Sequence, residues 1–201
     1  MTKELLLLRL TTLIKLKKIE TALNFEGWEF KSLKDAGLVS DPEESGTTFL
    51  ENARIKARAA HELACAAVLA DDSGLIVDAL DGAPGVYSSR YSGVDGDDSA
   101  NNAKLLRELS AVPLAKRTAR FASVLVFIDE DGLETVAEGF VEGRIGLVER
   151  GEHGFGYDPL FFPDAYNGEV TMAELTQSQK NAISHRGNAL RELRKKLHPS
   201  G

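Results

Sequence analysis

The amino-acid sequence predicts an α/β protein with a mixed sheet. Predicted strands and helices alternate along most of the chain, as they do where helices connect the strands of a sheet. The strongest strand pattern covers residues 120–128 and is apolar on both faces, which indicates a central position in the sheet. Asp131-Gly132 then predicts a hairpin turn into a strand from Glu134 to Val141, so we expect an antiparallel pair within the sheet.

The remaining elements follow from periodicity and capping signals. The spacing of Thr48 and Glu51 is that of a capping box at the start of an alanine-rich helix. Strands are predicted at residues 4–10, 28–30 and 66–69, and helices at residues 15–23, 51–64 and 101–109, with a further helix opening near Lys180 and running to Leu197.

Length and composition narrow the class of protein. With 201 residues the default is one domain, and a net charge of −7 gives no basic surface typical of nucleic-acid binding. The lone Cys65 allows no internal disulfide and fits a reducing cytoplasmic compartment. No uncharged apolar run approaches the ~18 residues that a membrane-spanning helix needs. We therefore expect a cytoplasmic protein that binds neither nucleic acid nor a membrane.

A carboxylate pair, Asp71-Asp72, follows the apolar run at 66–69. Successive side chains of a strand point to opposite faces, so these two carboxylates cannot act on one atom unless the chain turns there. Gly74 would allow such a turn. A carboxylate at a strand end suits a magnesium ion or a general base that deprotonates water. A plain turn capped by Ser73 explains the residues equally well.

Two further stretches carry candidate binding residues. Glycines flank Phe155, which leaves the ring free to stack on a flat ligand, although a tight turn with an aromatic plug is the alternative. Lys180, His185 and Arg186 crowd the start of a predicted helix, where the macrodipole disfavours cations. This crowding favours an acceptor-rich or anionic ligand; a solvated basic helix is the alternative.

The junction between the first predicted strand and helix holds Thr12 and Lys15. A loop of this kind, with hydroxyls and a lysine, is where a phosphate binds. No glycine is present to let the backbone approach an anion, so a basic amphipathic helix is an equal alternative.

Several segments, in one order between residues 40 and 198, resemble the inosine-triphosphate pyrophosphatase family, which acts on noncanonical purine nucleoside triphosphates. The matching segments are SGTTFLENA (45–53), ADDSGL (70–75), GAPGVYSSRY (82–91), GFGYDP (154–159) and AISHRG (182–187). The resemblance implies a single two-lobed domain over residues 1–201, with an elongated mixed sheet flanked by helices, a central substrate cleft and homodimer assembly. It also implies Mg²⁺-dependent hydrolysis of ITP, dITP and XTP to the monophosphate and pyrophosphate, which removes them from the nucleotide pool.

The resemblance also assigns roles to individual residues. Asp72 matches the catalytic proton acceptor and a magnesium ligand, and Glu44 matches a second acidic residue of the metal site. Substrate contacts are implied at Ser73, Phe155, Gly156, Tyr157, Asp158, Lys180, His185 and Arg186. Donors from the last three of these would pair with the C6 oxygen of hypoxanthine or xanthine and would be left unpaired by adenine. Rejection of guanine has to come from crowding at C2.

The N-terminal phosphate loop departs from the family pattern. Lys15 matches, but Thr12 stands where the family has asparagine, and the glycine is missing. Two functions from different classes follow: a house-cleaning pyrophosphatase, or a catalytically weak nucleotide-binding protein with an altered phosphate loop. The presence of Asp72 and Glu44 favours the first.

Overall fold

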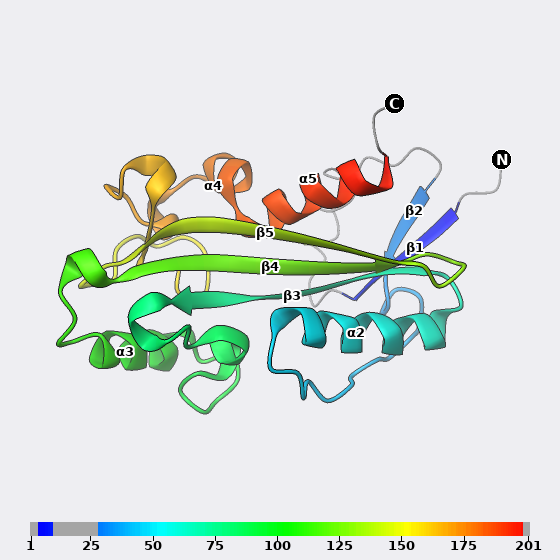
Figure 1. The fold of residues 1–201 in the computed structure, drawn as a ribbon, viewed down its shortest axis with the longest axis horizontal. Helices are drawn as coiled ribbons and strands as arrows, with labels where there is room; N and C mark the ends of the chain where they lie inside the picture. The colour runs from blue at the N-terminus through cyan, green and yellow to red at the C-terminus, as the bar shows by residue number, and fades with distance from the viewer. Residues whose placement is uncertain (1–3, 10–27, 199–201) are drawn as a thin grey trace. The chain divides into compact units, whose positions relative to one another are not determined.

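The computed structural model of this chain describes residues 4–9 and 28–198, and its strands form one six-stranded sheet in the order β2-β1-β3-β4-β5-β6 (Figure 1). The strands are β1 (Glu4–Arg9), β2 (Trp28–Ser32), β3 (Ala67–Val77), β4 (Thr118–Ile128), β5 (Glu134–Ile145) and β6 (Phe161–Pro163). Strand β1 pairs in parallel with β2 and β3, whereas β5 and β6 are antiparallel. The mixed sheet that the sequence predicts is therefore confirmed.

Four α-helices and five short 3₁₀ helices are found among the described residues. The α-helices are α2 (Phe49–Ala64), α3 (Asp98–Glu108), α4 (Gln177–Ile183) and α5 (His185–Leu197). Short 3₁₀ helices are η1 (Asp78–Leu80), η2 (Gly85–Arg90), η3 (Leu114–Lys116), η4 (Asp164–Tyr166) and η5 (Met172–Glu174). Among the described helices, none is both long and apolar enough to cross a lipid bilayer. The helix predicted at residues 15–23 lies outside the described residues, as do Thr12 and Lys15.

Two local predictions are confirmed in detail. The Thr48 side chain accepts from the backbone N–H of Glu51, and the Glu51 carboxylate accepts from the backbone of Thr48, so the predicted capping box opens α2. The turn between β4 and β5 is closed by a hydrogen bond from the Asp129 N–H to the Leu133 carbonyl, with Gly132 at φ +83°. A glycine is needed there because other residues rarely adopt that conformation.

Two other predictions are wrong. Asp71, Asp72, Ser73 and Gly74 do not form a turn but lie within β3, which continues without a break to Val77. The helix predicted from Lys180 onward is two helices, because Ser184 is extended, with ψ at 144°, and separates α4 from α5. Lys180 is therefore on α4, while His185 and Arg186 begin α5.

The chain divides into two compact units. The first unit comprises the described residues up to Asp72 together with 123–139 and 186–198, and the second comprises 73–122 and 140–185. Three strands, β3, β4 and β5, contribute residues to both units.

In the first unit, the alternation of a strand distributes apolar side chains to two clusters. Leu69 of β3 packs in the cluster that contains Leu190 of α5. Its neighbour Val68 packs in the cluster that contains Ala57 of α2. Successive strand residues point to opposite faces, so each helix covers one side of the same strand. Burial of a side chain such as Leu69 stabilises the fold by about 1.5–3 kcal/mol.

The core of the second unit is a single cluster. Leu105 and Leu109, from α3 and its C-cap, pack with Ile145 of β5 and Phe161 of β6 in that cluster. The buried guanidinium of Arg117 donates to the carbonyls of Leu109, Val112 and Gly146. These three bonds satisfy a buried cation and connect the end of α3 to the end of β5.

Candidate active site

The first unit brings Asp72 and Glu44 to one cation. Asp72 lies in β3 and is 8% exposed. The ammonium of Lys56 lies 2.5 Å from Asp72 Oδ1 and 2.8 Å from Glu44 Oε1. The two carboxylates to which the family resemblance assigns a metal site therefore converge on a single positive charge.

Lys56 was not predicted as a site residue. It lies on α2 between the buried alanines Ala53 and Ala57, so it occupies the face of the helix that is turned toward the core. Its side chain is 13% exposed, and its ammonium is held by the two carboxylates. A lysine within an otherwise alanine-lined stripe at i, i+3, i+4 spacing is the sequence signal that could have identified it.

Burial sets the protonation behaviour of Asp72. Burial raises the pKa of the Asp72 carboxyl to about 6; the Lys56 ammonium lowers that pKa, while Glu44 and Asp71 raise it further. The loss of hydration therefore outweighs the attraction of the lysine. A carboxylate with a pKa near the working pH is well suited to accept a proton from water and release it again.

The carboxylates of Glu44 and Asp72 suit a divalent cation whose other ligands are oxygen atoms of a bound phosphate compound. Mg²⁺ is commonly bound through one or two carboxylates, with phosphate oxygens and water completing the shell. Within the described ranges, no set of three or more His, Cys, Asp or Glu side chains could hold a metal on its own. Glu44 and Asp72 would hold such an ion as a pair.

Asp71 has a separate role from its neighbour. Its Oδ1 accepts from Ser123 Oγ at 2.8 Å, and its Oδ2 accepts from Arg186 Nε at 2.6 Å. Neither contact involves Lys56 or Glu44. The two carboxylates therefore serve opposite faces of β3, as strand alternation predicts. Arg186, a predicted substrate contact, is an ion-pair partner of Asp71 in this structure.

The second unit holds the predicted base-binding loop. Phe155 is 65% exposed as a residue, and its backbone N–H donates to Asp158 Oδ2 at 3.1 Å. The same carboxylate oxygen accepts from the Lys180 ammonium at 2.6 Å. Gly154 has φ at +99°, a conformation that other residues rarely adopt, and a Cβ there would also crowd the Asp158 carboxylate and the Lys180 ammonium.

Tyr157 and His185 are placed by packing. Tyr157 is buried, and its hydroxyl donates to the carbonyl of Ser88 at 2.9 Å. Burial raises the pKa of this phenol well above its ordinary value, so the hydroxyl keeps its proton. The Tyr157 carbonyl accepts from the N–H groups of Leu160 and Phe161, so both the ring and this carbonyl are engaged within the chain, and the role of Tyr157 as a substrate contact stays a prediction. The His185 ring stacks on Phe121, with centroids 5.2 Å apart.

The structure thus gathers the predicted residues into two groups. Glu44 and Asp72 share Lys56 in the first unit, and Phe155, Asp158 and Lys180 are linked in the second. Ser73 lies next to Asp72 in β3, and its role as a substrate contact stays a prediction.

The chain is therefore an α/β protein whose first unit holds the buried Asp72 beside the half-buried Glu44, and whose second unit holds the exposed Phe155 on a glycine loop. The chain belongs to the Ham1 family, whose model matches residues 12–196. This finding confirms the family that the sequence motifs indicate.

Relatives match nearly the whole chain. A dITP/XTP pyrophosphatase from Exiguobacterium sibiricum is 48% identical over 179 residues, covering 89% of each chain. The dITP/XTP pyrophosphatase from Bacillus subtilis is 48% identical over 184 residues, covering 91% of each. The solved structure of the Staphylococcus aureus Ham1 protein matches with a TM-score of 0.89 at 37% identity, covering 96% of this chain and 98% of that one.

Proposed function

We propose that this chain hydrolyses ITP, dITP and XTP to the monophosphate and pyrophosphate, with Mg²⁺ as its cofactor. The observation that carries the proposal is the buried Asp72 carboxylate, with a pKa raised to about 6, held beside Glu44 by Lys56. Relatives named dITP/XTP pyrophosphatase at 48% identity support the same assignment.

In the proposed reaction, Asp72 accepts a proton from the water that attacks the α-phosphorus. The new bond joins the water oxygen to phosphorus, and the bond to the pyrophosphate oxygen breaks. Lys56 holds the Asp72 carboxylate in place and keeps a positive charge beside it. Asp72 and Glu44 would hold Mg²⁺, which when bound would neutralise phosphate charge, the main demand of phosphoryl transfer.

Recognition of the base falls to the second group of residues. The exposed ring of Phe155 is free to stack on a purine. Lys180 carries donors for an oxygen at C6, and Asp158 fixes where its ammonium lies. We include His185 and Arg186 as further donors on the strength of the family resemblance. An adenine amino group would leave such donors unpaired, which is the kind of site that discriminates strongly.

The direct test is to incubate the purified protein with ITP and Mg²⁺ and to identify the products. The proposal requires IMP and pyrophosphate, with phosphate appearing only after an inorganic pyrophosphatase is added. Release of IDP and phosphate, or a preference for ATP, would refute it. Binding of ITP without turnover would instead favour the catalytically weak nucleotide-binding protein with an altered phosphate loop.

The single two-lobed domain, its central cleft, the homodimer and the cytoplasmic location belong to the same proposal and rest on the family resemblance. Sedimentation of the purified chain would test the dimer. A monomer at micromolar concentration that is fully active would remove dimerisation from the proposal.

A further inference from the structure

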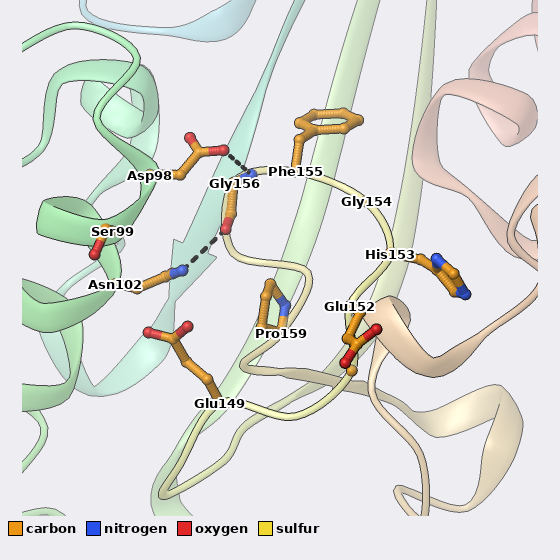
Figure 2. A pocket seen from close by; sticks show the side chains of 11 residues that line it. Asp98, Ser99, Asn102, Glu149, Glu152, His153, Gly154, Phe155, Gly156 and Pro159 are labelled. Carbon is orange, nitrogen blue, oxygen red and sulfur yellow. Dashed lines mark hydrogen bonds between the residues drawn. The ribbon is translucent and has the colours of Figure 1, made fainter.

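One residue of the base-binding loop is held from both sides by a helix that the family motifs do not include. Figure 2 shows Asp98 and Asn102 facing Gly156. Asp98 Oδ2 accepts from the Gly156 N–H at 2.6 Å, and Asn102 Nδ2 donates to the Gly156 carbonyl at 3.1 Å. Asp98 and Asn102 are four residues apart on α3 and therefore share one face of the helix.

These two bonds fix the peptides on either side of Gly156. The Gly156 N–H belongs to the peptide that joins it to Phe155, and its carbonyl belongs to the peptide that leads to Tyr157. Gly154 and Gly156 both have positive φ, at +99° and +61°, and glycine backbones have wide conformational freedom. Phe155 itself is held by its N–H bond to Asp158 Oδ2 and by the bond from the Asp158 N–H to its carbonyl. The two bonds to Gly156 add a connection from this loop to α3, and so help to set the direction of the exposed Phe155 ring.

Neither Asp98 nor Asn102 is the cap of α3. The helix is capped by Asp97, whose side chain accepts from the Ala100 N–H, so Asp98 is available to reach the loop. Asn102 is 3% exposed, and its Oδ1 is buried without a hydrogen-bond partner within the part of the chain that the structure describes. Burying an unpaired amide oxygen is unfavourable, so the use of asparagine at this position points to the donor that it presents to Gly156.

We propose that Asp98 and Asn102 are positioning residues for base recognition: they hold the Gly156 peptides so that Phe155 is presented to the purine. The inference rests on the proposed function, because it assigns these residues to the binding of the base in that reaction. The proposed chemistry is assigned to other residues, Asp72, Lys56 and Glu44, so the role of Asp98 and Asn102 is in binding of the base.

The test compares steady-state kinetics with ITP and Mg²⁺ for three variants. Asp98→Ala should raise KM about 10-fold, since a hydrogen bond to a charged acceptor is lost, while kcat stays within about threefold. Asp98→Asn keeps an acceptor oxygen and should restore most of the affinity. Asn102→Leu removes the donor and the unpaired oxygen together, so it should fold with unimpaired stability and still raise KM.

Asp97→Ala is the matched control. It removes the cap of the same helix and should lower the melting temperature, yet it should leave KM for ITP unchanged. The inference is overturned if Asp97→Ala raises KM as much as Asp98→Ala does, or if Asp98→Ala and Asn102→Leu both keep KM within twofold of the parent. The first outcome would mean that the higher KM of Asp98→Ala comes from a less stable α3 and not from the loss of its bond to Gly156.

Calorimetric titration with ITP in EDTA separates failure of this inference from failure of the proposed function. We expect about 10-fold weaker binding for Asp98→Ala and Asn102→Leu than for the parent. A parent protein that neither binds nor hydrolyses ITP would overturn the proposed function and this inference with it. A parent that does both, beside variants that bind equally well, would overturn this inference alone.

Discussion

Replacing Asp72 by asparagine should stabilise the metal-free protein, and the gain should grow as the pH rises. Burial raises the pKa of Asp72 to about 6 in the folded protein, against 3.8 for an ordinary aspartate. Between these two values the folded protein binds more protons than the unfolded chain does. Raising the pH through this window therefore lowers the free energy of unfolding of the parent. Asparagine does not titrate, so the free energy of unfolding of the variant does not fall with pH at this position.

The size of the effect follows from the two pKa values. Moving a pKa from 3.8 to about 6 corresponds to about 3 kcal/mol between the protonation states. About 2 kcal/mol of this falls between about pH 4.5 and 8, because the unfolded chain has already lost much of its proton at the lower limit. For a chain of 201 residues, 1 kcal/mol shifts the melting temperature by about 2–4 °C. The advantage of Asp72→Asn should therefore widen by about 4–8 °C across this range.

The assay is thermal unfolding of both proteins in EDTA at a series of pH values. EDTA is needed because a bound cation would favour the charged carboxylate and hide the effect. The two proteins share all other titrating groups, so the difference between their melting temperatures at each pH reports the titration of Asp72. The reasoning would be refuted by a difference in melting temperature that does not vary with pH. It would also be refuted if the parent became more stable relative to the variant as the pH rises. The second result would mean that attraction to Lys56 outweighs burial.

Three further predictions concern catalysis with ITP and Mg²⁺. Asp72→Asn should lower kcat about 10²- to 10⁴-fold while ITP still binds, because an amide cannot accept the proton of water; turnover within a few-fold of the parent would contradict this. Phe155→Ala should raise KM more than it lowers kcat, since stacking on a base contributes about 1–3 kcal/mol; an unchanged KM would place the ring away from the base. Thr12→Asn combined with Ile14→Gly should raise kcat/KM about 10- to 100-fold without changing the ITP-to-GTP ratio; no gain would show that Thr12 does not contact the phosphates.

Local patterns in the sequence were sufficient to predict most elements and the family. The capping box at Thr48 and the hairpin at Gly132 depend on residues within a few positions of each other, and both are confirmed. The separation of Asp71 from Asp72 follows from the alternation of any strand. The motif around Asp72 indicated the family, which the match over residues 12–196 confirms.

Local patterns failed where two conformations suit the same residues. The stretch from Asp71 to Gly74 has turn-forming residues, but it continues as part of β3. Ser184 is tolerated within a helix and equally at a break, so periodicity could not separate α4 from α5. In both places the surrounding structure, and not the propensity of the residues, decides the backbone.

The sequence alone therefore determined most of the elements and the family, and it singled out Asp72 and Glu44 as candidates, whereas the tertiary structure decided which residues these side chains meet. Asp71 meets Arg186 across 115 positions of the chain, and Asn102 meets Gly156 across 54. Even Lys56, only 16 positions from Asp72, reaches it from a helix to a strand. The periodicity of a helix or strand predicts on which side of the element a side chain lies, but not which residue it contacts there. That depends on the order of strands in the sheet and on the packing of helices against it, which only the folded chain specifies.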